Sequence, residues 1–197
     1  MWSGTRTVVV ALVLVVWPTA LHPPITALAW QASPPDFATR QDNQELRRLH
    51  GEDQADRARE VTDWSVVAPR DRARWRRVKE LFETDRIQTA RDYYHAAMIL
   101  QHGDRPDDYL LAHEFCVVAI SKGKNDKETR WLAASSEDRF LMEIGRPQRF
   151  GTQFRSEGDG PLRLYTVGAG VTDELRRLMG VHSLAEAKAH EAELNKK

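Results

Sequence analysis

Cysteine is nearly absent from the sequence, and the motifs of several common catalytic and metal sites are missing. Cys116 is the only cysteine among 197 residues, so the chain cannot form an internal disulfide and its stability must come from packing. The apolar neighbours Phe115, Val117 and Val118 predict a buried, unreactive thiol. There is no HExxH or paired-cysteine pattern and no GxSxG nucleophile motif. We therefore expect no cofactor.

The chain also lacks an excess of charge of either sign. It has 29 basic and 29 acidic side chains. Proteins that bind nucleic acids or anionic membrane surfaces usually carry a basic excess. The balance argues against nucleic acid as a partner.

Long hydrophobic runs are absent, apart from a short one near the N-terminus. The run Val8–Trp17 follows Arg6, the only charged residue of that region, and precedes the small-residue site Ala27–Ala29. This order is typical of a cleavable signal peptide, whereas a membrane-spanning helix needs about 20 apolar residues. We predict a signal peptide over 1–29, a mature chain that begins at Trp30, a secreted or periplasmic location, and no stable membrane insertion after cleavage.

Much of the remaining sequence has helical periodicity. Leu46 and Leu49 share one face of a predicted helix, and Trp75, Val78 and Phe82 share one face of the next. Glycine, a common helix stop, follows the ends of three later segments. Turns this short make neighbouring helices antiparallel. The predicted helices span Asp42–Glu60, Asp71–Thr84, Thr89–Gln101, Asp107–Lys122 and Glu128–Ile144, with a break over Thr62–Pro69.

The helical period ends after Gly145. A turn at Gly158–Pro161 and weak alternation over Leu162–Val167 predict a hairpin or ordered loop. Thr172 and the capping box Ser183–Glu186 then predict two helix starts. The expected fold is all-α, with about six helices in antiparallel helical hairpins and a small β-hairpin or ordered loop near 150–167. A flexible lead-in over 30–41 precedes this single helical domain, which covers 42–197.

Asp138 is the most unusual polar residue, because apolar residues flank it at helical spacing. A lone buried charge would cost several kcal/mol, so this carboxylate is either paired or functional. One interpretation is a buried ion pair with Arg146 or Arg57. The other is an acid in a pocket beside His102.

The histidines do not have the spacing of a metal site. His95 and His102 are seven residues apart, which places them on one helix face but about 10 Å from each other. One ion cannot bind both without ligands from elsewhere. A further polar pair, His113-Glu114, contains only one histidine. We therefore predict no metal site.

The polar clusters are expected to meet in the fold as one connected network. The candidate catalytic residues are His102, Asp138 and Arg139. The candidate binding residues are Asp53, Asp56, Arg57, Gln101, Arg146, Gln148, Thr152 and Gln153.

Three stretches carry a resemblance to a known family. They are TARDYYHAAMILQHG, DYLLAHE and EDRFLMEIGRPQRFGTQ, with the EDQADR block from Glu52 upstream. The chain resembles a bacterial family of uncharacterised proteins, a domain of unknown function, that shares QH at a helix end, a later DR and the pattern GxxQx[FY]GTQ. The resemblance spans about 42–195 and implies no activity. There is a looser likeness to tetratricopeptide and Sel1-like helical hairpins, but one or two hairpins are too few for a solenoid.

Two classes of function remain. The first is a non-catalytic binding module of the cell envelope, whose partner is a protein, a peptide or a small envelope ligand. The second is a hydrolase-like enzyme that uses a polar pocket around His102 and Asp138. The absence of a nucleophile or metal motif favours binding.

Overall fold

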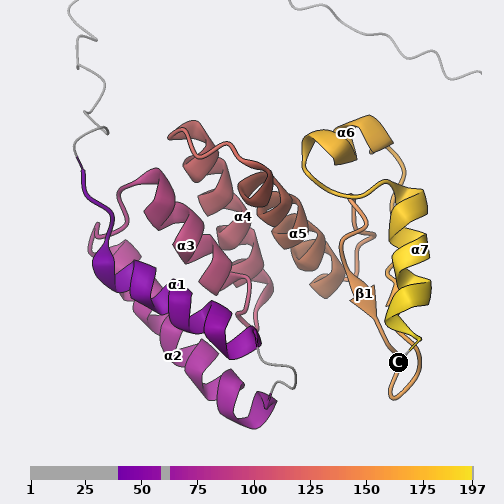
Figure 1. The fold of residues 1–197 in the computed structure, drawn as a ribbon, viewed down its shortest axis with the longest axis horizontal. Coiled ribbons are helices and arrows are strands. Elements are labelled where there is room, and N and C mark those ends of the chain that lie inside the picture. Colours follow the sequence, from indigo (N-terminus) through magenta and orange to yellow (C-terminus); the bar gives the residue numbers. More distant parts are fainter. Residues whose placement is uncertain (1–39, 59–62, 197) are drawn as a thin grey trace, which may run out of the picture. The chain divides into compact units, whose positions relative to one another are not determined.

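The computed structural model describes residues 40–58 and 63–196 (Figure 1). The predicted signal peptide and nearly all of the lead-in lie outside these ranges. The helices are α1 (Gln44–Arg57), α2 (Trp64–Glu83), α3 (Ala90–Leu100), α4 (Pro106–Ser121), α5 (Lys127–Glu143), α6 (Asp173–Leu178) and α7 (Leu184–Leu194), and the strands are β1 (Phe154–Arg155) and β2 (Arg163–Leu164). The prediction of an all-α fold with a small hairpin is confirmed. No helix in the described ranges is long and apolar enough to span a bilayer.

Side-chain caps fix where several helices begin. The Thr89 hydroxyl accepts the backbone N–H of Asp92, whose carboxylate accepts the N–H of Thr89, so both sides of a capping box are present at α3. Ser183 and Glu186 form the predicted capping box at α7, and Thr172 caps α6. The local sequence therefore supplies the caps at these starts, and at α3 the capping residues also bond Asp42 and Asn43 of the preceding segment.

The predicted break over Thr62–Pro69 is wrong, because α2 begins at Trp64 and includes Pro69. Asp63 caps this earlier start by accepting the backbone N–H of Ser65 at 3.0 Å. Pro69 lies in the second turn of the helix, where it removes the hydrogen bond that its N–H would have made to the Ser65 carbonyl and its ring crowds that carbonyl. A capped first turn thus outweighs the proline.

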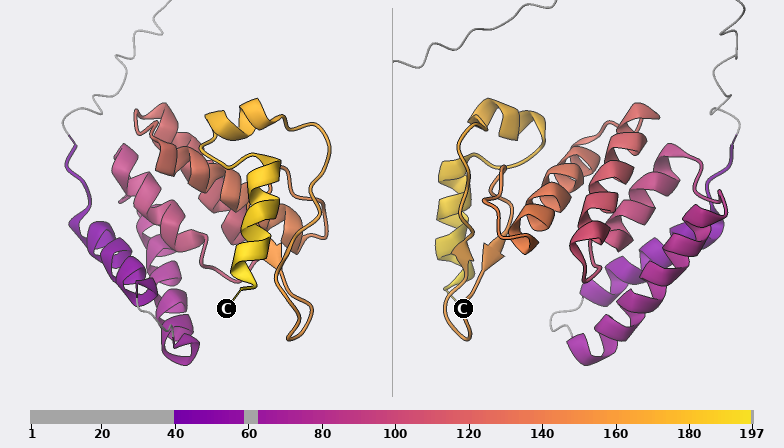
Figure 2. Two further views of the ribbon diagram at one scale, coloured as in Figure 1. Left: turned by 45° about the vertical axis from the view of Figure 1, so that its right-hand side comes forward. Right: turned by 180° about the vertical axis from the view of Figure 1, so that it is seen from behind.

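The first five helices share one core. Helix α3 packs against α1, α2 and α4, and α4 packs against α5 (Figures 1 and 2). Alanines at the contacts of α3, α4 and α5, including Ala96, Ala112 and Ala133, are almost fully buried and allow close approach. Cys116 is fully buried in this core, as predicted, and burial raises the pKa of its thiol.

The segment after α5 is tied to the helices by a second, smaller core. Strands β1 and β2 pair antiparallel, with Phe154 opposite Leu164. Phe150 and Val181 pack with Ala134 of α5. Figure 1 shows the hairpin, α6 and α7 beside the α5 end of the domain.

Candidate functional site

Asp138 binds the loop that follows α5 by its main chain. The side chain is fully buried, and its two oxygens accept the backbone N–H groups of Arg149 (2.6 Å), Phe150 (2.9 Å) and Thr152 (3.0 Å). The Thr152 hydroxyl donates to the same carboxylate at 2.8 Å. The expected arginine partner for Asp138 is therefore wrong, since main-chain dipoles compensate this charge. With both oxygens occupied and sealed, the carboxylate does not have the access of a pocket acid.

Arg176 of α6 binds the carbonyl groups of the same loop. It is 3% exposed and donates from Nε to the carbonyl of Phe150 (3.0 Å) and from Nη2 to that of Arg149 (3.3 Å). Asp138 thus accepts the amides of Arg149, Phe150 and Thr152, and Arg176 donates to the carbonyls of Arg149 and Phe150. We call this pair the C-terminal clamp.

Two buried glutamines complete the loop. Gln148 is fully buried, accepts the Gln153 N–H and donates to the carbonyls of Gln153 and Tyr165. The Gln153 side chain donates to the carbonyl and hydroxyl of Ser135. Because this loop lacks the regular hydrogen bonds of a helix, the glutamine side-chain amides bond main-chain groups that would otherwise be unpaired. The arrangement makes both glutamines structural.

Arg139 connects the clamp region to the end of α3. Its Nε donates to Gln153 at 3.2 Å, and its Nη1 donates to the carbonyl of Gln101 at 2.6 Å. Burial lowers the pKa of this guanidinium. The buried Gln101 side chain donates to the Met98 sulfur, so only its main chain joins the network.

A second network of buried charges joins α1 to α2. Asp56 accepts from Arg74 at 2.9 Å, and Arg57 donates to Asp53 at 2.9 Å and to Asp71 at 2.6 Å. Arg74, which is 5% exposed, also donates to Asp71 at 2.7 Å. Burial raises the pKa of Asp56, but the hydrogen bonds from arginine outweigh burial and hold the pKa below its usual value. Opposite charges therefore balance inside the α1–α2 interface.

His102 extends this second network to the protein surface. Its Nδ1 lies 3.0 Å from Oδ1 of Asp53, which is fully buried. Burial raises the pKa of Asp53, but the His102 hydrogen bond and the charge of Arg57 together keep that pKa below its usual value. Asp53 is thus a carboxylate that accepts the Nδ1 proton, which leaves Nε2 as an acceptor in the neutral ring. Nε2 has no partner among the described residues.

His102 lies at the edge of a cavity of about 310 Å³ between α2 and the α3–α4 turn. We call it the tryptophan cavity, because two indoles line it and its walls are mostly apolar. Its lining residues are Trp64, Ala68, Asp71, Arg72, Trp75, Arg76, His102, Gly103 and Asp104.

Glycine at 103 is required where the turn passes closest to α4. A Cβ there would lie 2.7 Å from Oδ2 of the buried Asp108. Burial raises the pKa of this carboxyl group. Oδ2 of Asp108 and the indole N–H of Trp75 are both buried, and neither completes a hydrogen bond of normal geometry. Two buried polar groups behind Gly103 therefore lack the hydrogen bonds that buried polar groups normally form.

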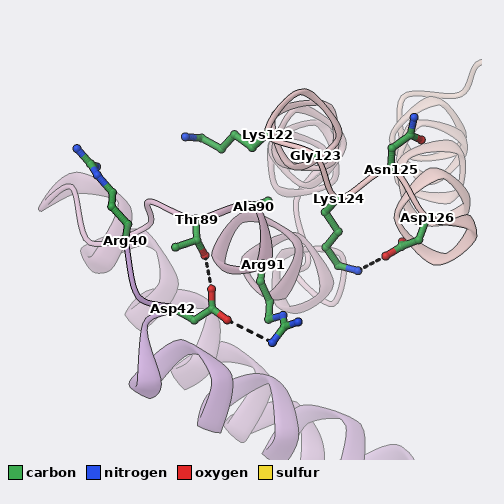
Figure 3. A pocket seen from close by; sticks show the side chains of 10 residues that line it. All are labelled: Arg40, Asp42, Thr89, Ala90, Arg91, Lys122, Gly123, Lys124, Asn125 and Asp126. Carbon is green, nitrogen blue, oxygen red and sulfur yellow. Dashed lines mark hydrogen bonds and ion pairs between the residues drawn. The ribbon is translucent and has the colours of Figure 1, made fainter. Parts of the chain in front are cut away.

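A larger hollow of about 630 Å³ lies between the start of α3 and the α4–α5 turn (Figure 3). Ion pairs occupy it: Arg91 lies 3.3 Å from Asp42, and Lys124 pairs with Asp126. Lys122 and Lys124 stand beside the end of α4, where cations offset the free helix carbonyls. The fold thus accounts for the charged groups of this hollow other than Arg40.

Three further histidines, His50, His95 and His113, are structural. The rings of His50 and His95 stack with centroids 4.3 Å apart. Burial lowers the pKa of His50, and burial together with the neighbouring His50 lowers the pKa of His95 to about 4. His113 donates to the Ala133 carbonyl at 2.9 Å. Within residues 40–58 and 63–196, no group of three or more His, Cys, Asp or Glu side chains has the arrangement of a metal site.

The single network predicted from the sequence is therefore two networks that meet at Gln101–His102. Asp53 holds His102 on one side, and Arg139 holds the Gln101 carbonyl on the other. Arg146 belongs to neither, because it is exposed and only its backbone N–H is bonded, to the Leu141 carbonyl.

Sequence reasoning missed Arg74 and Arg176 as buried charges. Arg74 belongs to a run of five arginines over residues 70–77, a pattern typical of a solvated helix face, and Arg176 lies next to the exposed Arg177. The available signal was the helical spacing of Arg74 from the buried residues Val67, Val78 and Leu81. Its acidic partners lie 3 to 21 residues away in sequence, so they could not be recognised from this pattern.

The fold and the site thus define an all-α domain with an ionic helix interface and an aromatic cavity. Comparison with known proteins finds no match: no family model, no curated sequence and no solved structure is significantly similar to the chain. The resemblance to the bacterial family rests on its motifs and stays a prediction. Its QH, DR and GxxQx[FY]GTQ elements do come together, through the contacts of Arg139.

Proposed function

We propose that this chain is a non-catalytic binding module of the cell envelope and that its ligand binds in the tryptophan cavity. The observation that carries the proposal is a mostly apolar cavity of about 310 Å³ with Trp64 and Trp75 in its walls. Small-molecule sites are concave, mostly apolar and equipped with a few polar groups. Here His102 supplies such a group, held in place by the buried Asp53.

The exposure of Trp64 supports this interpretation. Its side chain is 61% exposed, although it stands on a helix that buries other apolar residues such as Val78 and Leu81. An indole left at the rim of a cavity gives a ligand a large apolar surface to cover. Since Trp64 contributes little to the core, a ligand role explains its position better than stability does.

A fragment screen by saturation-transfer NMR tests the proposal. Fragments that bind the mature chain should lose their signal with Trp64→Ala, which removes an exposed side chain and leaves the core intact. Trp131→Ala on α5 is the matched control, because Trp131 is also partly exposed and lies outside the cavity. A screen in which every hit survives Trp64→Ala, or a screen without hits, would contradict a ligand site here.

A hydrolase-like enzyme is the second candidate, and the Asp53–His102 pair favours it. A carboxylate that holds Nδ1 and leaves Nε2 open is the arrangement of a general base. Asp138 has no part in this version, because the C-terminal clamp occupies it. Turnover of a panel of esters and phosphodiesters that is abolished by His102→Gln, with unchanged thermal stability, would favour the enzyme over the binding module.

A further inference from the structure

The five arginines of α2 differ in their partners. Arg70, Arg74 and Arg77 each form ion pairs with carboxylates of α1 or α2, at 2.7 to 3.8 Å. Arg72 and Arg76 form no ion pair with any residue that the structure describes, and both line the tryptophan cavity. The unpaired guanidinium groups of this helix are therefore gathered at the cavity.

Their spacing suits one anionic group. Residues four apart on a helix are neighbours on its surface, with Cβ atoms about 5–6 Å apart. Two like charges at this spacing repel each other, and a bound anion would relieve the repulsion. The guanidinium fork matches the geometry of carboxylate and phosphate oxygens. Lys79 adds positive charge nearby, since its Nζ lies 4.8 Å from the centre of a Trp75 ring.

The carboxylates of the cavity do not cancel this charge completely. Asp71 is already paired with Arg57 and Arg74. Asp104 forms no ion pair within the described ranges, so it is the one lining carboxylate free to oppose a bound anion. Replacing Asp104 with a neutral residue should therefore raise the affinity of the cavity for an anion.

We propose that the tryptophan cavity binds a small molecule with one flat ring and one anionic group of the phosphate or carboxylate class. This inference rests on the proposed function and adds the chemistry of the ligand. The ring lies against the indoles of Trp64 and Trp75, and the anionic group binds Arg72 and Arg76. A volume of about 310 Å³ is at the small end for ligand pockets, which suits a single substituted ring.

Three probes separate the parts of the proposed ligand: phenyl phosphate, inorganic phosphate and benzyltrimethylammonium. Affinities are measured by isothermal titration calorimetry on the mature chain. The indole N–H resonances, assigned with single Trp→Phe variants, report the location of binding. Phenyl phosphate should shift the Trp64 and Trp75 resonances, leave Trp131 in place, and bind at least tenfold more tightly than either other probe.

Charge variants test the role of the arginines. The double variant Arg72→Gln, Arg76→Gln should weaken phenyl phosphate binding tenfold or more. The matched control is Arg47→Gln with Arg48→Gln, which removes two exposed charges of α1 away from the cavity. It should change the affinity less than twofold. Asp104→Asn should strengthen binding severalfold.

The outcomes distinguish the inference from the proposed function. If benzyltrimethylammonium binds more tightly than phenyl phosphate and shifts the Trp64 and Trp75 resonances, the cavity is a ligand site but its ligand is not an anion. Equal loss of affinity in the Arg72/Arg76 variant and in the α1 control would also overturn it. If no probe shifts either indole resonance, the ligand class is wrong, and the fragment screen with Trp64→Ala decides separately whether the cavity binds ligands at all.

Discussion

Replacing Asp138 with alanine should destabilise the domain more than any surface substitution. The change removes the acceptor of three backbone N–H groups and one hydroxyl. A buried N–H without a partner costs about 1–3 kcal/mol. The Phe150 N–H is buried and gains no water, whereas Arg149 and Thr152 lie nearer the surface and become partly hydrated. We therefore expect the free energy of unfolding to fall by about 3–5 kcal/mol.

Urea unfolding followed by circular dichroism at pH 7 measures this loss. Asp138→Asn should cost less, about 2–3 kcal/mol, because the amide keeps one acceptor oxygen but turns its NH₂ group toward donors. Glu137→Gln is the matched control. Its carboxylate pairs with the Arg149 side chain at the surface, at 3.0 Å, so its loss should cost less than about 1 kcal/mol. If Asp138→Ala costs no more than Glu137→Gln, the clamp does not stabilise the loop as argued.

Four further predictions concern other parts of the chain. The folded pKa of His95 is about 4, below its usual value, so its contribution to stability is complete above about pH 6.5 and is lost as the pH falls toward 4. The loss amounts to about 3 kcal/mol, and His95→Gln should flatten this pH dependence in urea melts. Arg74→Met leaves Asp56 and Asp71 with one arginine each and should cost about 3 kcal/mol, whereas exposed Arg72→Met should cost less than about 0.5 kcal/mol in the same melts. Cys116 should react with a thiol reagent only in denaturant, and reaction of the native protein at a similar rate would show that its burial is incomplete. The intact mass of the exported protein should correspond to a chain that begins at Trp30, and a membrane-bound form that keeps residues 1–29 would rule out cleavage.

Local signals explain how much of the fold could be predicted from the sequence. The starts of α3 and α7 were readable because Thr89 and Ser183 cap their own helices within three residues. The hairpin was readable from its glycines, but its two-residue strands were not, since strands this short have no period. The start of α2 was misjudged because Pro69 is a strong local signal that the Asp63 cap outweighs.

The site could be predicted only in part, because its contacts join residues that are distant in sequence. Asp53 and His102 are 49 residues apart, and Asp138 meets main-chain amides that carry no residue-specific signal. A carboxylate in an apolar stripe indicates that a partner exists, but not that the partner is a backbone. The tryptophan cavity was missed altogether, since Trp75 on a helical stripe has the pattern of an ordinary core residue.

The C-terminal clamp also has a consequence for the order of folding. Asp138 stands on α5, which packs against α4 across a short turn, so its surroundings can form from contacts that are local in sequence. Arg176 reaches Phe150 only when a chain of 26 residues has closed, and that closure costs conformational entropy before the contact forms. Asp138 can therefore order residues 149–152 first, and their exposed carbonyls then form a template on which α6 docks. A chain that stops before Arg176 would keep the five-helix core and the amide half of the clamp, and would leave the carbonyls of Arg149 and Phe150 open to water.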